Sequence, residues 1–186
     1  MSAAQRKKAQ TPAWRKYWQR KSPVLKFLGG FLLFMLLFYL FYYSALYQNV
    51  LSGPIERVQT QLSGGLLRLL GYQAEVNGDA ILGNGFSVQI AKGCDGVEPL
   101  FMLLGGILVF PIAWRLKWPG LLAGFLALSV LNILRIAGLF LAGIHIPAAF
   151  DFLHLHGGFV IFTLITILLW MVWANWAMQK SRPAAA

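Results

Sequence analysis

Four long apolar stretches constrain the fold of this chain more than any other feature of its sequence. Their only charged side chains are Glu98 and Arg135. The stretches cover residues 27–47, 97–114, 119–144 and 155–178. A helix rises about 1.5 Å per residue, so each stretch is long enough to cross a hydrocarbon core of about 30 Å. With a mean hydropathy of +0.63 over 186 residues, the chain is too apolar for a soluble domain. We predict an all-α integral membrane bundle of about four transmembrane helices.

The basic residues predict how this bundle is oriented. Of the 16 lysines and arginines, eight precede the first apolar stretch, two lie between the second and the third, and two follow the fourth. All six acidic residues fall on or next to the opposite side. This is the positive-inside pattern, which places both ends of the chain in the cytoplasm. The net charge of +10 therefore indicates orientation and contact with anionic membrane lipid, and we expect no nucleic-acid partner.

This topology divides the chain into five parts. They are a basic cytoplasmic arm (1–26), transmembrane helix 1 (27–47), an extracytoplasmic segment (48–93), a three-helix transmembrane core (94–178) and a cytoplasmic tail (179–186). A second extracytoplasmic loop is expected at residues 145–154, between the last two spans.

The extracytoplasmic segment has two parts with different periodicity. Ser52-Gly53-Pro54 is typical of a helix start and Gly71 of a helix stop. Between them an apolar stripe recurs every three or four residues, at Ile55, Val58, Leu62, Leu66 and Leu69. We predict an amphipathic helix that lies on the outer leaflet or against the bundle. After it, the turn pairs Asn77-Gly78 and Asn84-Gly85 predict a small β-hairpin or meander over residues 73–90.

The single cysteine, Cys94, directly precedes the second apolar stretch. An intrachain disulfide is therefore impossible. Asp95 and Glu98 have the spacing of a capping box, which places Cys94 beside the positive end of a helix. Such a position lowers the pKa of a thiol and favours the nucleophilic thiolate. The alternative is a small buried structural side chain.

Arg135 lies nine residues before the outer end of the third stretch, which corresponds to a depth of about 13 Å. A guanidinium inside a membrane costs about 2.5–3.5 kcal/mol on insertion scales, and such residues usually face a polar interior. Ser129, Asn132 and Arg135 form one narrow polar stripe. We expect this stripe to face the other spans. The alternative is an arginine whose guanidinium reaches the membrane surface, but a depth of about 13 Å exceeds the length of an arginine side chain.

Two histidines, His154 and His156, begin the fourth stretch. Their side chains point to opposite faces of a helix, so only one of them can face Cys94. Asp151 lies one turn before His154 and could hold its ring, while Gly158 lies one turn after it and allows a close approach. These neighbours favour His154, with His156 as the alternative. One cysteine and two histidines make a poor metal site, and we expect neither a metal nor a cofactor.

A thiol, a guanidinium and an imidazole at one membrane face suit acyl transfer. The imidazole can take the thiol proton and return it to a leaving amine, and the guanidinium can stabilise the developing negative charge.

The motifs around these three residues resemble the exosortase/archaeosortase family. They are Gly93-Cys94-Asp95-Gly96 at the start of a span, Asn132-Ile-Leu-Arg135-Ile in the next, and His154 four residues before Gly158 in the last. The resemblance covers roughly residues 73–178 and is greatest to the short exosortase H branch. Many relatives have Ser-Gly-Leu after the cysteine where this chain has Asp95-Gly96-Val97, and longer members have about twice as many spans.

The resemblance implies an integral-membrane cysteine transpeptidase or protease. Such proteins process C-terminal sorting signals of exported proteins, which consist of a short motif, an apolar span and a basic tail. It implies Cys94 as the nucleophile, Arg135 as the stabilising cation and His154 as the acid/base. We expect substrate-binding or supporting roles for Asn132, Asp151, Glu98, Asp95, Gly158 and His156. It further implies a multi-pass protein of the bacterial inner membrane with its active site facing the periplasm, and a thioester that is passed to water or to a lipid or glycan acceptor.

Two other classes of function remain open from the sequence. One is a non-catalytic membrane assembly or scaffold protein with a structural Cys94. The other is a small transporter or channel subunit with Arg135 in an anion path.

Overall fold

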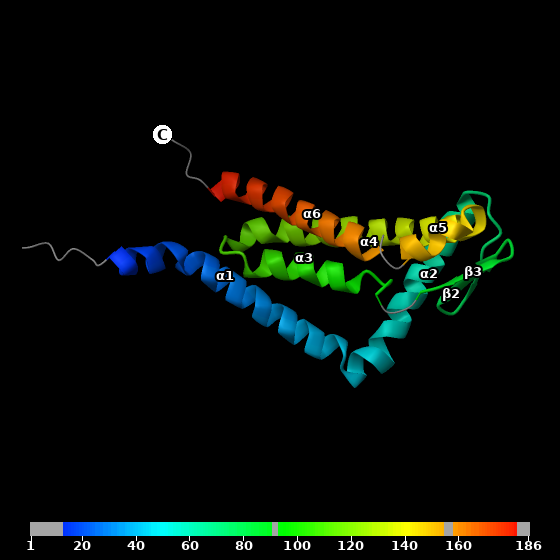
Figure 1. Cartoon of the computed structure of the whole chain (residues 1–186), viewed down its shortest axis with the longest axis horizontal. Helices are drawn as coiled ribbons and strands as arrows, with labels where there is room; N and C mark the ends of the chain where they lie inside the picture. The colour runs from blue at the N-terminus through cyan, green and yellow to red at the C-terminus, as the bar shows by residue number, and fades with distance from the viewer. Residues whose placement is uncertain (1–12, 91–92, 155–157, 182–186) are drawn as a thin grey trace, which may run out of the picture.

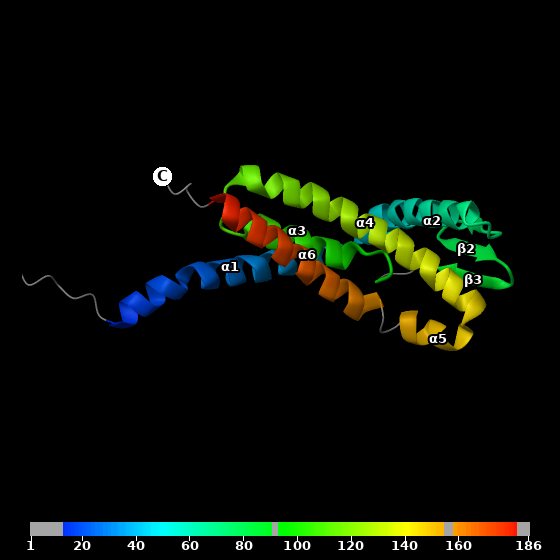
Figure 2. The same ribbon diagram turned by 90° about the horizontal axis from the view of Figure 1, so that it is seen from above.

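The computed structural model describes residues 13–90, 93–154 and 158–181. Four helices run along the long axis of the molecule: α1 (Ala13–Tyr42), α3 (Val97–Val109), α4 (Trp114–His145) and α6 (Gly158–Ser181). In Figure 1 the beginning of α1 and the end of α6 lie at the same end of the bundle. The α3 and α6 helices both pack against α4 and run opposite to it (Figures 1 and 2). The predicted all-α membrane bundle is thereby confirmed.

Three of these helices are long and apolar enough to cross a membrane. They span Ser22–Tyr42, Trp114–His145 and Val160–Ser181. The second predicted span is shorter than expected, because α3 has 13 residues and a length of about 20 Å. Its end follows from Pro111, whose ring disfavours helical dihedrals at the residue before it. Phe110 is accordingly extended, with φ −61° and ψ 132°.

Between α1 and α3 the chain folds back toward the bundle. A five-residue π-helical turn, η1 (Tyr47–Leu51), leads into α2 (Ser52–Leu69), which ends two residues before Gly71 as predicted. In Figure 1, α1 and α2 meet in a sharp V before α2 crosses toward α4.

The α2 helix packs with the opposite face from the one a soluble amphipathic helix would use. Its buried residues include Thr60, Ser63, Gly64 and Leu67, whereas Val58 is 55% and Leu62 is 52% exposed. Ser63 contacts α4, and Gly64 packs against Val76. Small and hydroxylated residues are the usual contacts between helices in a membrane, where apolar side chains can face lipid. The apolar stripe therefore suits contact with the outer leaflet.

A three-stranded antiparallel meander follows α2. It consists of β1 (Glu75–Asn77), β2 (Ala80–Gly83) and β3 (Phe86–Gln89) in that order. Asn84 and Gly85 connect β2 to β3 with φ values of +52° and +77°, as the Asn-Gly pair predicts. Ile81 and Val88 are buried in a cluster with Phe140 of α4, so the sheet covers the C-terminal half of that helix.

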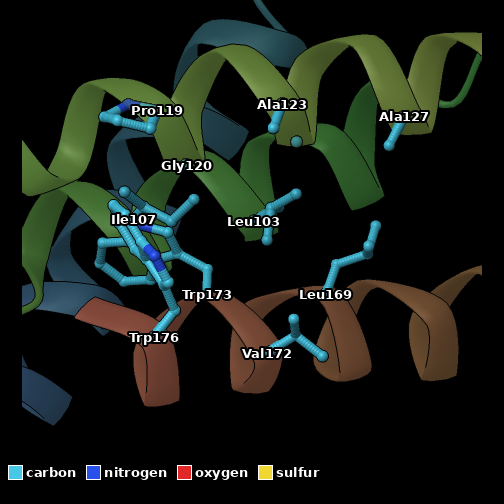
Figure 3. A pocket seen from close by; sticks show the side chains of 11 residues that line it. Leu103, Ile107, Pro119, Gly120, Ala123, Ala127, Leu169, Val172, Trp173 and Trp176 are labelled. Carbon is cyan, nitrogen blue, oxygen red and sulfur yellow. The ribbon is translucent and has the colours of Figure 1, made fainter. Parts of the chain in front are cut away.

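The opposite end of the bundle has an apolar core, here called the distal core. It consists of Leu103, Ile107, Leu128, Trp173, Ala174 and Ala177. A hollow of about 370 Å³ lies beside it. Figure 3 shows the side chains that line it, with Ala123 and Ala127 of α4 on one side and Leu169 and Val172 of α6 on the other. Gly120 of α4 is packed so tightly that an added Cβ would lie 2.2 Å from Nε1 of Trp173.

Candidate active site

Cys94 lies in the turn that directly precedes α3. The helix begins at Val97 with Gly96 in the capping position, so the predicted capping box of Asp95 and Glu98 is not the cap that forms. Asp95 instead accepts a hydrogen bond from the backbone N–H of Val97 through Oδ1 (3.2 Å). The side chain of Glu98 accepts a hydrogen bond from the hydroxyl group of Tyr39 on α1.

Gly96 is required in this turn for two reasons. Its φ of +67° is a conformation that side chains rarely adopt, and an added Cβ would lie 2.8 Å from Cγ of Asn132. The cysteine turn therefore approaches α4 more closely than any other residue at position 96 would allow.

The thiol of Cys94 contacts both of the other predicted catalytic side chains. Nη2 of Arg135 on α4 donates to its sulfur at 3.6 Å. Nδ1 of His154, which follows the short helix α5 (Pro147–Phe152), lies 3.8 Å from the same sulfur. Two side chains that lie 41 and 60 residues from the cysteine along the chain thus meet at its sulfur.

The electrostatic state of the thiol differs from the sequence-based expectation. Cys94 is only 9% exposed, and this burial raises the pKa of its thiol. The neighbouring Arg135 lowers the pKa, but burial is the larger effect, and Asp95 raises the pKa further. The expectation of a lowered thiol pKa is therefore wrong.

Arg135 is held over an aromatic ring with part of its guanidinium free. Its Cζ lies 5.2 Å from the centre of the Phe162 ring on α6. Nε of Arg135 is buried, and within residues 13–90, 93–154 and 158–181 it has no hydrogen-bond partner. The expected inward orientation of the polar stripe is observed, and the buried Nε–H of Arg135 is a hydrogen-bond donor without a partner in the described part of the chain.

His154 is oriented differently from the prediction. Its ring stacks on Phe150 at 5.5 Å between centroids and 10° between planes. Asp151 is exposed, and no hydrogen bond joins it to His154 in the described part of the chain. Gly158 is the first residue of α6, whereas His156 lies outside the described residues.

Three residues that sequence reasoning did not select contact the cysteine turn. Tyr42 and Tyr47 donate to Oδ2 of Asp95 at 3.4 and 3.2 Å, and Gln59 of α2 donates to its backbone carbonyl at 2.6 Å. Asp95 is 3% exposed, and burial raises the pKa of its carboxyl group although these hydroxyl donors oppose the effect. No short motif marks such residues, because their positions are fixed only by the packing of α1 and α2.

An apolar groove of about 730 Å³ adjoins the cysteine turn. Its walls come from α2, α3 and α4, and Asp95, Gly96 and Asn132 form a polar patch within it. Several of its side chains, including Val58, Leu62 and Phe125, are more than 45% exposed on the lipid-facing surface.

Comparison with known proteins gives one match. The chain matches the model of the transmembrane exosortase family (Exosortase_EpsH) over residues 21–171, a range that includes Cys94, Arg135 and His154. No curated protein and no solved structure matches the chain.

Proposed function

Because the chain belongs to the transmembrane exosortase family, we propose that it is a membrane cysteine transpeptidase or protease that cleaves C-terminal sorting signals. One observation carries the proposal beyond family membership. The thiol of Cys94 lies within 4 Å of both a guanidinium nitrogen and an imidazole nitrogen, on three different structural elements. A nucleophile, a base and a cation at one atom are the set that acyl transfer requires.

In the first half-reaction, the sulfur of Cys94 attacks the carbonyl carbon of the scissile peptide bond. Its proton moves to Nδ1 of His154 as the C–S bond forms, which suits a thiol of raised pKa. Arg135 stabilises the negative charge that develops on the carbonyl oxygen. The C–N bond then breaks, the imidazolium protonates the leaving amine, and a thioester on Cys94 remains.

In the second half-reaction, a nucleophile attacks the thioester carbonyl. This acceptor is water or a hydroxyl or amine group of a lipid or glycan. The neutral His154 takes its proton, a C–O or C–N bond forms, and the C–S bond breaks. Return of that proton to the sulfur restores the starting enzyme, so the cycle needs no oxidant, reductant or cofactor.

The substrates in this proposal are exported proteins that end in a short motif, an apolar span and a basic tail. The groove beside the cysteine turn supports this class of substrate, because it is apolar, faces lipid and reaches Asp95 next to the nucleophile. The proposed location is the bacterial inner membrane, with the site facing the periplasm. The basic tail of the substrate would then remain on the same side as the basic arm of the enzyme.

Co-expression with an exported protein of the same organism that carries such a tail tests the proposal. Cells with the wild-type chain should accumulate a shortened product, and cells with Cys94→Ala should accumulate only the full-length form. Full-length substrate in both would exclude the activity on that class of protein. Reporter fusions at Asn84 and Lys117 should report opposite sides of the membrane, and a shared side would refute the orientation.

A further inference from the structure

We propose that Gln59 of α2 is a positioning residue that holds the nucleophile turn in its reactive geometry, an inference that rests on the proposed function. Nε2 of Gln59 donates to the backbone carbonyl of Asp95 at 2.6 Å. Oε1 of Gln59 accepts from Nδ2 of Asn132 at 3.1 Å, and the same Nδ2 donates to the carbonyl of Cys94 at 3.2 Å. Two consecutive carbonyls are thus held by one pair of linked amides.

Holding two consecutive carbonyls fixes two peptide planes. A trans peptide is planar, so its N–H points opposite to its carbonyl. With the carbonyls of Cys94 and Asp95 turned toward Gln59 and Asn132, the N–H groups of Asp95 and Gly96 point away from α2 and α4. The first of these planes adjoins the Cα of Cys94, so holding it restricts the directions that the Cα–Cβ bond of Cys94 and its sulfur can take.

The two amides differ in burial, and Gln59 is the less enclosed of the two. Asn132 is 2% exposed, and its side chain packs against Gly96. Its position is therefore set by the α4 backbone that carries it and by the backbone of the cysteine turn that it contacts. Gln59 is half-buried and lies on the wall of the groove. Its longer side chain reaches across from α2 and connects this helix to a turn 36 residues later.

The helix that carries Gln59 is itself fixed to α4. Thr60 and Ser63 of α2 are fully buried, and the hydroxyl of Ser63 donates to the carbonyl of Ile133 at 3.4 Å. Through its hydrogen bond to the carbonyl of Asp95, Gln59 thus holds the cysteine turn in a fixed position relative to α2. Its loss should move the sulfur relative to Arg135 and His154 without detaching α2 from the bundle.

Cys94 is the only cysteine, so alkylation by a maleimide reports on its sulfur without any substrate. The experiment compares the wild type with Gln59→Met, Gln59→Glu and the control Gln61→Met, each purified as the full chain in lipid nanodiscs. Methionine keeps the length of the side chain but neither hydrogen bond, and glutamate keeps only the acceptor. Gln61 lies on the same helix and is exposed, so the same substitution there tests the general effect of methionine on α2.

For Gln59→Met and Gln59→Glu we expect a fall in kcat of about ten- to a hundred-fold with KM within about two-fold of the wild type. The midpoint pH of alkylation should rise by about half a unit or more, because the thiolate loses its fixed contact with Arg135. Gln61→Met should match the wild type in both measurements.

An alkylation midpoint unchanged in both Gln59 variants, with folded protein recovered, would overturn the inference. If Gln59→Met does not fold, Gln59→Leu decides, because it also lacks both hydrogen bonds and adds no charge that would itself raise the pKa of the thiol. If the wild type cleaves no sorting signal but the midpoint still shifts, the positioning role stands and only the proposed function fails.

Discussion

The two ends of the helix bundle differ in the polarity of their buried side chains. At the end where α3 begins, Asp95, Asn132 and Thr60 are buried polar residues, and Nε of Arg135 is buried without a partner in the described part of the chain. At the other end, the distal core is apolar, with a hollow of about 370 Å³ beside it. Its buried cation, Lys117, donates to the carbonyl of Leu108 and lies 5.0 Å above the Trp114 ring.

We expect this difference to separate the residues that determine activity from those that determine stability. Burying polar groups inside a membrane protein is costly, so such groups persist where they do chemistry. Substitutions at the cysteine end should therefore change activity more than stability. Substitutions in the distal core should do the reverse.

The largest effect is expected at the nucleophile. Cys94→Ala and Cys94→Ser should each lower cleavage by about a thousand-fold or more, because neither can form the thioester. Both variants should reach nearly wild-type levels in the membrane, measured by quantitative immunoblot. An active Cys94→Ser variant would show that the sulfur is structural and would remove the contrast between the two ends.

Next in size is the loss of the base. His154→Ala should lower kcat by about a hundred-fold or more, since its imidazole is the group that lies beside the thiol. His156→Ala is the matched control two residues away and should retain most activity. The measurement is substrate cleavage normalised to membrane abundance, and an inactive His156→Ala beside an active His154→Ala would reverse the assignment.

Arg135 should separate the effect of charge from that of shape. Arg135→Lys keeps the charge but loses the planar fork, and we expect a loss of about a hundred-fold in kcat. Arg135→Gln also removes the charge that lowers the pKa of Cys94, so the rise of activity with pH should begin at a higher pH. Normal turnover in the lysine variant, read from pH–rate profiles, would count against a role in stabilising the oxyanion.

The smallest effect on activity should come from the distal core. Gly120→Ala forces a Cβ against Trp173, whose Nε1 donates to the carbonyl of Leu116 at 3.0 Å. We expect a loss of about 1–3 kcal/mol in stability but unchanged cleavage per folded molecule. Gly138→Ala on the same helix has no atom within 4 Å of the added Cβ and should be neutral in a thermal unfolding assay. A lower kcat in Gly120→Ala would show that the two ends are coupled.

Much of the fold follows from local patterns in the sequence. Apolar length predicted the long helices, and Asn84-Gly85 predicted a turn of the meander because its two positive φ values suit these residues. Pro111 explains why α3 ends before the apolar stretch does, a boundary that hydropathy alone overlooks.

The sequence predicts those residues of the candidate site whose side-chain type itself implies a chemical role. It does not predict the residues that reach the site only through the packing of distant helices. Cys94, Arg135 and His154 stood out because a thiol, a buried cation and an imidazole are rare in apolar surroundings. The role of Asp151 was inferred from spacing along a helix, but α5 ends at Phe152 and leaves the carboxylate exposed. Gln59 and Asn132 are 73 residues apart, and a single sequence carries no sign of their contact.

Because α3 is short, the cysteine turn at its start lies part-way along α4 and not at the end of that helix. The α3 helix covers about 20 Å, whereas the hydrocarbon core is about 30 Å thick and the 32-residue α4 extends for about 48 Å. The α4 helix continues for ten residues beyond Arg135, so the end of α4, together with α2 and the sheet, extends past Cys94 along the bundle. If the proposed thioester forms at Cys94, these elements should shield it from bulk solvent and lengthen its lifetime compared with one on an open surface. Slow hydrolysis would then give a membrane-borne acceptor time to arrive and would favour transfer of the cleaved protein over its release.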